Sequence, residues 1–492
     1  MPNAAARPSE WLPGALAVVL AVTATRVALL ALNRTDLYMD ESQYWFWGQK
    51  LAFGYYSKPP LIGWVIRASV ELGGSDAPFW VRLPAPLFHA ATALILAWIA
   101  GHRYGRGAAL WVAALYVTLP MVSVGSALIS TDTIMFPFLA AALGLWLAAL
   151  DRRAAGRSAW ALALAAGCAA GVAFLGKYAA VYGPTGAALA ALFVPAARPG
   201  WRAAGWGALG FLLAAAPNVG WNVANGLTTL QHTLDNVEWV RAPGDRSGLN
   251  VAGLAEFFGA QFIVFGPVLF GALLWLGARG GAGSVERRIL LWLSLPIIAV
   301  VCGQALLEEA YANWAAAAYL AGLLAVVPWL MTKRRVWLWG SLALHTAFAA
   351  ALPLALAFGT DWRAGDRLLF ARYLGQSEMS RDILALAREH GDEVVVDGRS
   401  LLADLFHTGR DAGVTIWARP PRGRPANHYE QTRAMPDSVT GEVLYVGRLD
   451  DLPERCGSIA PIATLAPDSG AYRERPMGAW RLPADCLRPP AP

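Results

Sequence analysis

The sequence predicts a polytopic α-helical membrane protein with a soluble α/β domain after its last membrane helix. Hydrophobic residues make up 56% of the chain and charged residues only 15%, well below the charged fraction of a typical soluble domain. The apolar residues gather in long runs, and the final 132 residues have an ordinary polar composition. These observations exclude a soluble cytosolic enzyme, a disordered chain and a small disulfide-rich scaffold.

Apolar runs of roughly 17 to 25 residues are long enough to cross a bilayer, and the sequence contains about eleven of them. The first run has no convincing cleavage site, so we expect it to stay as a signal-anchor helix. We therefore expect a transmembrane domain over residues 1–360. The runs lie near residues 11–32, 83–100, 108–125, 132–150, 158–175, 179–196, 203–220, 252–277, 289–306, 313–331 and 336–358.

Basic residues predict the orientation of this domain. They cluster in alternate connections, and the opposite connections have almost none, which by the positive-inside rule makes the basic connections and the N-terminus cytoplasmic. The loops 33–82 and 221–251 and the tail 361–492 then lie outside. A high content of Ala, Arg and Gly favours a bacterial origin, hence the inner (cytoplasmic) membrane with a periplasmic tail. The basic clusters are 102–106, 152–157, 198–202, 279–288 and 333–335.

The tail has 17 basic and 19 acidic residues, which is typical of a soluble domain. Helical spacing covers residues 381–390, and residues 393–397 and 442–446 have the apolar character of strands. These elements predict a small α/β domain. Cys456 and Cys486 also lie here, and in an oxidising compartment they either pair or remain free thiols.

Two adjacent carboxylates, Asp40 and Glu41, follow the first predicted span. One interpretation is that either of them caps the next helix, because acidic side chains accept hydrogen bonds from free backbone N–H groups at helix starts. The other is that one carboxylate is a general base at the membrane surface.

Lys58 lies in the segment Gly54-Tyr-Tyr-Ser-Lys-Pro-Pro-Leu-Ile-Gly-Trp64. Ser57 is a potential cap for a helix whose first turn holds Pro59 and Pro60, a position at which proline is tolerated. A lysine at that helix start suits a phosphate ligand. The alternative is an interfacial lysine that reaches for lipid headgroups.

A third carboxylate, Asp132, begins the fourth predicted span, where it is either a helix cap or a functional group. On the same predicted membrane side are Lys177, His232 in the second long loop, and Asn313. Carboxylates can activate an acceptor hydroxyl, and cations can stabilise a phosphate leaving group. The adjacent carboxylates leave a divalent cation open, although the sequence holds no complete metal-ligand set. No nucleotide-binding loop or nucleic-acid partner is indicated.

Five motifs together resemble the membrane glycosyltransferases of GT-C fold, in particular the branch of protein O-mannosyltransferases and lipid A aminoarabinose transferases. Their order, spacing and predicted membrane side run over residues 1–360. The motifs are Asp40-Glu41 followed by Tyr44 and Trp47, Gly54-Tyr-Tyr-Ser-Lys-Pro-Pro-Leu61, Thr131-Asp132, Gly176-Lys177 and Asn313-Trp314.

The resemblance implies a donor sugar, hexosyl or pentosyl, on a polyprenyl phosphate in the membrane lipid. The sugar would pass, generally with inversion, to a lipid, glycan or protein acceptor outside the cytoplasm. It implies Asp40 as catalytic base, Lys58 as phosphate ligand, Glu41 and Asp132 as supporting residues and Lys177 as a further phosphate contact. We add Tyr44, Tyr55, His232 and Asn313 as candidate substrate-binding residues. Ser57 departs from the aminoarabinose transferases, which typically carry an acid before the lysine.

Two other classes of protein remain open. A polytopic transporter or flippase would move a polyprenyl-linked or sugar-linked lipid without bond chemistry, but the distinctive charges here lie at span ends and no internal repeat is evident. A non-catalytic scaffold of envelope assembly would make the charged set coincidental. Two roles remain open for the tail: it either covers the site and stabilises the fold, or it recognises the acceptor.

Overall fold

The computed structural model describes residues 8–237, 248–391 and 393–489 and consists of two compact units. The helical unit comprises Met1–Ala31, Lys58–Ile62 and Arg82–Pro353. The mixed unit comprises Leu32–Ser57, Gly63–Val81 and Leu354–Pro492. Residues 238–247 of the predicted loop 221–251 lie outside the described residues. The division into functional domains at residue 360 stays a prediction.

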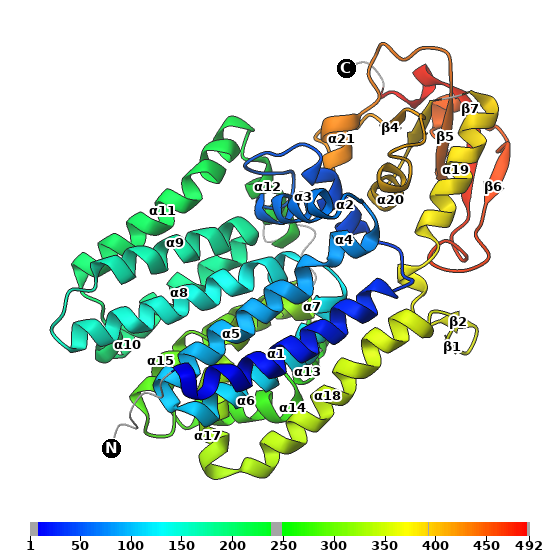
Figure 1. Ribbon diagram of the computed structural model, residues 1–492. Coiled ribbons are helices and arrows are strands. Elements are labelled where there is room, and N and C mark those ends of the chain that lie inside the picture. The colour runs from blue at the N-terminus through cyan, green and yellow to red at the C-terminus, as the bar shows by residue number, and fades with distance from the viewer. Residues whose placement is uncertain (1–7, 238–247, 392, 490–492) are drawn as a thin grey trace. The chain divides into compact units, whose positions relative to one another are not determined.

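Long helices build the helical unit (Figure 1). Short 3-10 helices, η1 (Tyr178–Val181), η2 (Pro195–Ala197) and η3 (Ala312–Ala315), connect some of them. The α-helices are α1 (Pro8–Ala31), α5 (Pro84–Tyr104), α6 (Arg106–Thr118), α7 (Pro120–Ala127), α8 (Thr131–Ala154), α9 (Trp160–Gly176), α10 (Tyr182–Phe193), α11 (Trp201–Ala224), α12 (Thr228–Val237), α13 (Val251–Val264), α14 (Pro267–Ala278), α15 (Val285–Trp292), α16 (Leu295–Leu307), α17 (Ala318–Lys333) and α18 (Arg335–Phe358), whose last turn belongs to the mixed unit.

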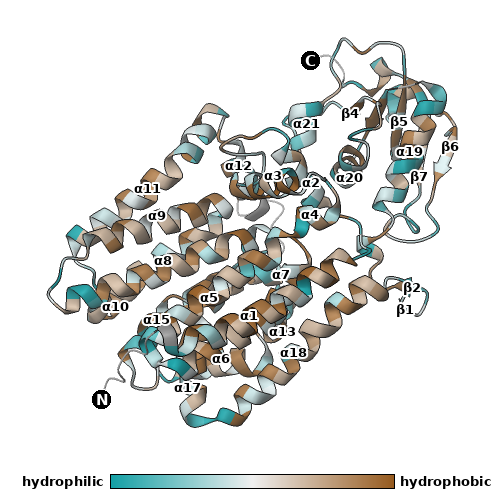
Figure 2. Ribbon diagram, in the orientation of Figure 1, coloured by the Kyte–Doolittle hydropathy of each residue, from teal (hydrophilic) through white to brown (hydrophobic). Residues whose placement is uncertain are grey.

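Each predicted apolar run falls on helix, and Figure 2 shows hydrophobic stretches along α1, α5 and α18. Within the described residues, six helices are long and apolar enough to cross a membrane, or up to eight if each of two bent pairs is one span. The expected count of about eleven spans is therefore not confirmed. The difference arises because three further apolar helices have only 10 to 17 residues and because two runs are broken by bends.

The bends have local causes. Helices α6 and α7 meet at 54° where Pro120 follows Leu119, and α13 and α14 meet at 114° around Gly266 and Pro267. Proline has no backbone N–H to continue a helix. Gly266 has φ +87° and a Cβ there would lie 2.1 Å from the imidazole of His345, so this corner accepts only glycine.

One end of the helical unit gathers three of the predicted basic connections. Arg103, in the last turn of α5, forms ion pairs with Asp151 of α8 at 2.9 Å and with Glu286 of α15 at 2.8 Å. These three residues lie in or beside the clusters 102–106, 152–157 and 279–288. The connections therefore share one end of the unit, as the alternation predicts; which membrane side that end faces stays a prediction.

The mixed unit contains a five-stranded sheet with the order β4-β3-β5-β7-β6. Strand β3 pairs in parallel with β4 and β5, whereas β7 runs antiparallel to both β5 and β6. The predicted helix 381–390 lies within α19, and the predicted strands lie at β3 and β5. The elements are α2 (Met39–Gly48), α3 (Leu61–Gly73, which begins in the helical unit), α4 (Pro78–Arg82), β1 (Arg363–Ala364), β2 (Arg367–Leu368), η4 (Ala371–Tyr373), α19 (Gln376–His390), β3 (Val394–Val396), α20 (Arg399–Thr408), β4 (Ile416–Ala418), α21 (His428–Arg433), β5 (Glu442–Arg448), η5 (Glu454–Cys456), β6 (Ala463–Leu465), β7 (Met477–Pro483) and η6 (Ala484–Leu487).

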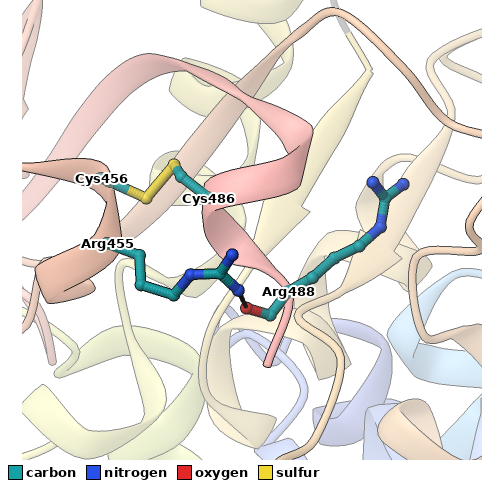
Figure 3. The surroundings of a disulfide bond; sticks show 4 residues. All are labelled: Arg455, Cys456, Cys486 and Arg488. Carbon is teal, nitrogen blue, oxygen red and sulfur yellow. Dashed lines mark hydrogen bonds between the residues drawn. A yellow bond between two sulfur atoms is a disulfide. The ribbon is translucent and has the colours of Figure 1, made fainter. Parts of the chain in front are cut away.

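The two faces of this sheet have separate cores because side chains alternate along a strand. Val394 and Val396 pack with helices α19 and α20 on one face, and Val395 packs with Tyr445 and Trp480 on the other. The second face is closed by the segments η5 and η6, which a Cys456–Cys486 disulfide joins (Figure 3). Of the two outcomes left open by the sequence, the cysteines therefore pair.

Candidate active site

Asp40 and Glu41, the acidic pair at the start of α2, have different hydrogen-bond partners. The Glu41 carboxylate accepts a hydrogen bond from the backbone N–H of Tyr38 at 2.9 Å, and Glu41 is only 1% exposed. This bond satisfies one of the free donors at the helix start. Glu41 is thus the capping residue of the pair, and the carboxylate of Asp40 is left for another partner.

That partner is Arg399. Its guanidinium donates to the Asp40 carboxylate and, at 2.5 Å, to the side-chain oxygen of Gln43. Burial alone would lower the pKa of Arg399, but the negative charge of Asp40 raises it overall, so the arginine stays charged. The Asp40 side chain is 41% exposed, which leaves part of the carboxylate accessible to a reacting group.

Arg399 reaches Asp40 because helix α20 begins at this residue and packs along α2. Gly398 precedes it with φ +97°, a backbone conformation that glycine adopts easily. Ring contacts hold the two helices together: Phe46 lies 4.8 Å from Phe406, and Trp45 meets His407 edge-on at 4.7 Å, both between ring centroids. The position of the arginine is thus fixed by a packed interface within the mixed unit.

The predicted substrate-binding tyrosines lie in an aromatic cluster beside α2. Tyr55 stacks on Trp47 with ring centroids 5.0 Å apart, Tyr44 lies 5.2 Å from the same indole, and His428 approaches Tyr55 edge-on. The Tyr55 hydroxyl donates to the backbone carbonyl of Lys50 at 3.2 Å. Burial raises the pKa of Tyr55 to about 12, so its hydroxyl remains a donor at neutral pH.

The Lys58 segment differs from the sequence expectation. Helix α3 begins at Leu61, so Pro59 and Pro60 precede it rather than occupying its first turn, and the predicted Ser57 cap is wrong. A residue before proline is driven toward extended backbone, and two successive prolines impose this on Lys58 and Pro59. Lys58 is half-buried in the helical unit.

Three predicted residues from distant segments of the helical unit meet at Asp132. Lys177 donates its ammonium to both carboxylate oxygens at 2.8 Å, and the Asn313 amide donates to Oδ2 at 2.8 Å. Asp132 is 8% exposed, so this is a largely buried, hydrogen-bonded ion pair. The alternative that Asp132 caps α8 is not supported, because Ser130 accepts from the backbone N–H of Thr133 and is the cap.

A buried polar network that the sequence did not indicate supports the start of α8. Thr133 contacts the His89 imidazole at 3.2 Å, and the other nitrogen of His89 contacts the Tyr116 hydroxyl at 3.1 Å. Arg26 donates to the Ser123 hydroxyl at 3.0 Å on the neighbouring helix. The available signal was the presence of an arginine and a histidine within apolar runs, where ionisable residues are rare.

His232 lies half-buried on α12 of the helical unit. Among residues 8–237, 248–391 and 393–489, no cluster of three or more His, Cys, Asp or Glu side chains is arranged to hold a metal ion. Seven of the predicted site residues form two described groups. Asp40, Glu41, Tyr44 and Tyr55 lie on or beside α2 in the mixed unit, and Asp132, Lys177 and Asn313 meet in the helical unit. Lys58 and His232 also belong to the helical unit.

Comparison with known proteins identifies the class of protein that has this fold. Residues 57–221 match the family model of dolichyl-phosphate-mannose-protein mannosyltransferases. The chain is 40% identical to lipid A galacturonosyltransferase RgtD of Rhizobium johnstonii over 481 residues, covering 96% of this chain and 99% of that protein. The chain therefore belongs to the GT-C membrane glycosyltransferase family that includes this enzyme, which supports the enzyme hypothesis over the transporter and scaffold alternatives.

Solved structures agree on the fold. ArnT from Cupriavidus metallidurans matches in the apo state with TM-score 0.64 and 15% identity, over 98% of this chain and 100% of that one. The same protein bound to undecaprenyl phosphate matches with TM-score 0.63 and 15% identity, over 97% and 100%. The apo oligosaccharyltransferase of Archaeoglobus fulgidus matches with TM-score 0.51 and 14% identity, over 88% and 69%.

Proposed function

We propose that this enzyme transfers galacturonic acid from a polyprenyl-phosphate donor to a lipid A-type acceptor at the outer face of the bacterial inner membrane. The observation that carries the proposal is the 40% identity to a lipid A galacturonosyltransferase along nearly the whole chain. In this arrangement the N-terminus is cytoplasmic and residues 361–492 are periplasmic, as the basic connections predict.

Ser57 supports an acidic rather than an amino sugar. Aminoarabinose transferases typically carry an acid before the motif lysine, and a carboxylate there suits an ammonium group on the donor. In this chain the position is a neutral, buried serine. Because this chain has no negative charge beside Lys58, a uronate carboxylate on the donor is not repelled there. Like charges at close range are unfavourable in a partly buried site.

The proposed reaction is a single displacement. The acceptor hydroxyl oxygen attacks the anomeric carbon, the bond from that carbon to the phosphate oxygen breaks, and polyprenyl phosphate leaves. The acceptor proton passes to the Asp40 carboxylate, and attack opposite the leaving group inverts the anomeric centre. Lys58 stabilises the charge that develops on the phosphate.

The Asp132 group has a positioning role in this proposal. Lys177 already neutralises Asp132, so the pair adds little net charge to the site. We propose that the ammonium and the Asn313 amide also face the donor phosphate or sugar, with Asp132 fixing their geometry. Tyr44, Tyr55 and His232 remain proposed contacts to substrate, and Glu41 holds the start of α2.

The test uses the full chain in lipid nanodiscs with lipid A acceptor and three polyprenyl-phosphate donors carrying galacturonate, a neutral hexose or an aminopentose. Release of polyprenyl phosphate is measured for the wild type and for Asp40→Asn. The control variant is Asp382→Asn, because the Asp382 carboxylate is exposed on α19. We expect release with the galacturonate donor, a loss of roughly 10²- to 10⁴-fold in Asp40→Asn, and normal activity in Asp382→Asn. A preference for the neutral or amino sugar would reject the donor, and an active Asp40→Asn variant would reject the base.

A further inference from the structure

A pocket lined by basic side chains lies at the end of the helical unit that carries the basic connections. This pocket of about 620 Å³ is lined by residues of α14, α15 and α17 and of their connections. Its walls include Trp275, Trp329, Arg287, Lys333 and Arg334, and none of its lining residues is acidic. The fold thus brings together two basic clusters, 279–288 and 333–335, that are separate in the sequence.

The loop before α15 is shaped by one of these arginines. The Arg287 guanidinium donates to the backbone carbonyls of Gly281 and Ala282, both at 3.0 Å. Ala282 lines the pocket with φ +47°, a left-handed conformation that is unfavourable for a residue with a Cβ. Arg287 therefore fixes the pocket wall.

The remaining two cations are available to a ligand. In the part of the chain that the structure describes, the side chains of Lys333 and Arg334 form no ion pair or hydrogen bond, and both residues are exposed. The neighbouring acid Glu286 does not neutralise them, because it is paired with Arg103 at 2.8 Å. The pocket consequently carries uncompensated positive charge.

Aromatic rings give the pocket the character of a membrane interface. The indoles of Trp275 and Trp329 stack with centroids 4.7 Å apart, and the Arg279 guanidinium lies 5.6 Å from the centre of the Trp275 ring. Trp275 is 42% exposed, and Val285, two residues before Arg287, is 50% exposed. Tryptophan is enriched at the headgroup level of membranes.

We propose that this pocket binds the phosphate headgroup of an anionic membrane phospholipid, with Lys333 and Arg334 on the phosphate and the acyl chains along the exposed apolar side chains. Basic pockets between membrane helices fit this chemistry, whereas a free phosphate would gain nothing from the tryptophans and the valine. The site is independent of the sugar-transfer chemistry and lies on different residues.

The experiment measures melting temperature and bound lipid for the purified full chain. Nanodiscs of phosphatidylcholine are compared with nanodiscs containing phosphatidylglycerol, and native mass spectrometry counts retained phosphatidylglycerol in detergent. We expect phosphatidylglycerol to raise the melting temperature of the wild type. The variant Lys333→Gln/Arg334→Gln should lose this response and bind the lipid on the order of tenfold more weakly.

The matched control is Arg152→Gln/Arg157→Gln, which removes two exposed arginines of another basic connection. It should respond to phosphatidylglycerol like the wild type. The single variant Lys333→Gln, with an intermediate loss expected, covers the case in which the double variant fails to fold. An unchanged lipid response in the Lys333 and Arg334 variants, or an equal loss in the control, overturns the site. Equal stabilisation by inorganic phosphate overturns the lipid as its ligand.

Discussion

The Arg399 guanidinium at the start of α20 donates to the Asp40 carboxylate in the first turn of α2, although the two residues are 359 positions apart in the chain. The contact lies within the mixed unit, where α2 and α20 pack together. The arginine also donates to the side-chain oxygen of Gln43, so it fixes the orientation of the carboxylate that we propose as the base.

We expect Arg399→Ala to lower kcat about 10- to 100-fold, because the proposed base loses the group that orients it. Arg399→Lys keeps the charge but loses the forked contact with Asp40 and Gln43, so it should show a smaller loss. Transfer rates and thermal melting of both variants test this. A rate loss that only follows a loss of folded protein would show that Arg399 is purely structural.

The neighbouring carboxylates at the start of α2 should separate into a chemical and a structural role. Glu41→Gln weakens the hydrogen bond from the Tyr38 N–H, and we expect a loss of about 1 kcal/mol in the free energy of unfolding with most activity retained. Asp40→Asn should lose transfer activity and keep most of its free energy of unfolding. Thermal melting and transfer rates of both variants test this. An inactive Glu41→Gln variant with normal melting would assign the base to Glu41 instead.

The buried pair of Asp132 and Lys177 should show strong coupling in stability. Each of Asp132→Asn and Lys177→Met leaves one buried charge without its partner, which we expect to cost about 3 to 5 kcal/mol. The double variant removes both charges and should recover much of this loss without recovering transfer activity. Denaturation in detergent and activity assays on all three variants give the cycle. Additive stability losses would contradict a direct interaction.

The convergence of Asp132, Lys177 and Asn313 could be anticipated from the sequence, because each follows or begins an apolar run on one predicted membrane side. The role of Glu41 could not be, because capping depends on which carboxylate faces the Tyr38 N–H. Arg399 carried no signal, since it stands in a polar tail among 17 basic residues and reaches Asp40 only through tertiary packing. The helix bends at Pro120 and Gly266 were also missed, because an apolar run looks continuous whether or not its backbone turns.

Stability of the mixed unit should fall in mild acid because of His407. Burial lowers the pKa of His407 to about 4, although its hydrogen bond to the Asp76 carbonyl opposes the shift. The unfolded chain, with a pKa of about 6.5 for this group, therefore binds more protons between pH 6.5 and 4. The neutral, buried His407 therefore contributes fully to the free energy of unfolding above about pH 6.5, and this contribution is lost as the pH falls toward 4.

Melting of His407→Gln and wild type across pH 4 to 8 isolates this effect, since the amide can still donate to the Asp76 carbonyl. The stability gap between the two proteins should narrow as the pH falls. Asp404 acts in the opposite direction, because burial raises its pKa to about 6 and its contribution is lost as the pH rises from about 4 to 6. Asp404→Asn serves as the comparison. Parallel melting curves for wild type and His407→Gln would contradict a neutral, buried histidine.

The Cys456–Cys486 disulfide should stabilise the sheet face that η5 and η6 cover. It joins residues 30 apart, and cross-linking a loop of this length restricts the unfolded chain by about 3 to 4 kcal/mol. Arg455 adds a hydrogen bond to the Arg488 carbonyl at 2.9 Å beside it, so the two segments stay in contact through polar groups as well (Figure 3).

We therefore expect reductant to lower the melting temperature of the wild type, and Cys456→Ser/Cys486→Ser to melt at the lower temperature with or without reductant. Cys168→Ser/Cys302→Ser, which changes the two free cysteines, should behave like the wild type. Unchanged melting of the reduced wild type would show that sheet packing alone holds these segments.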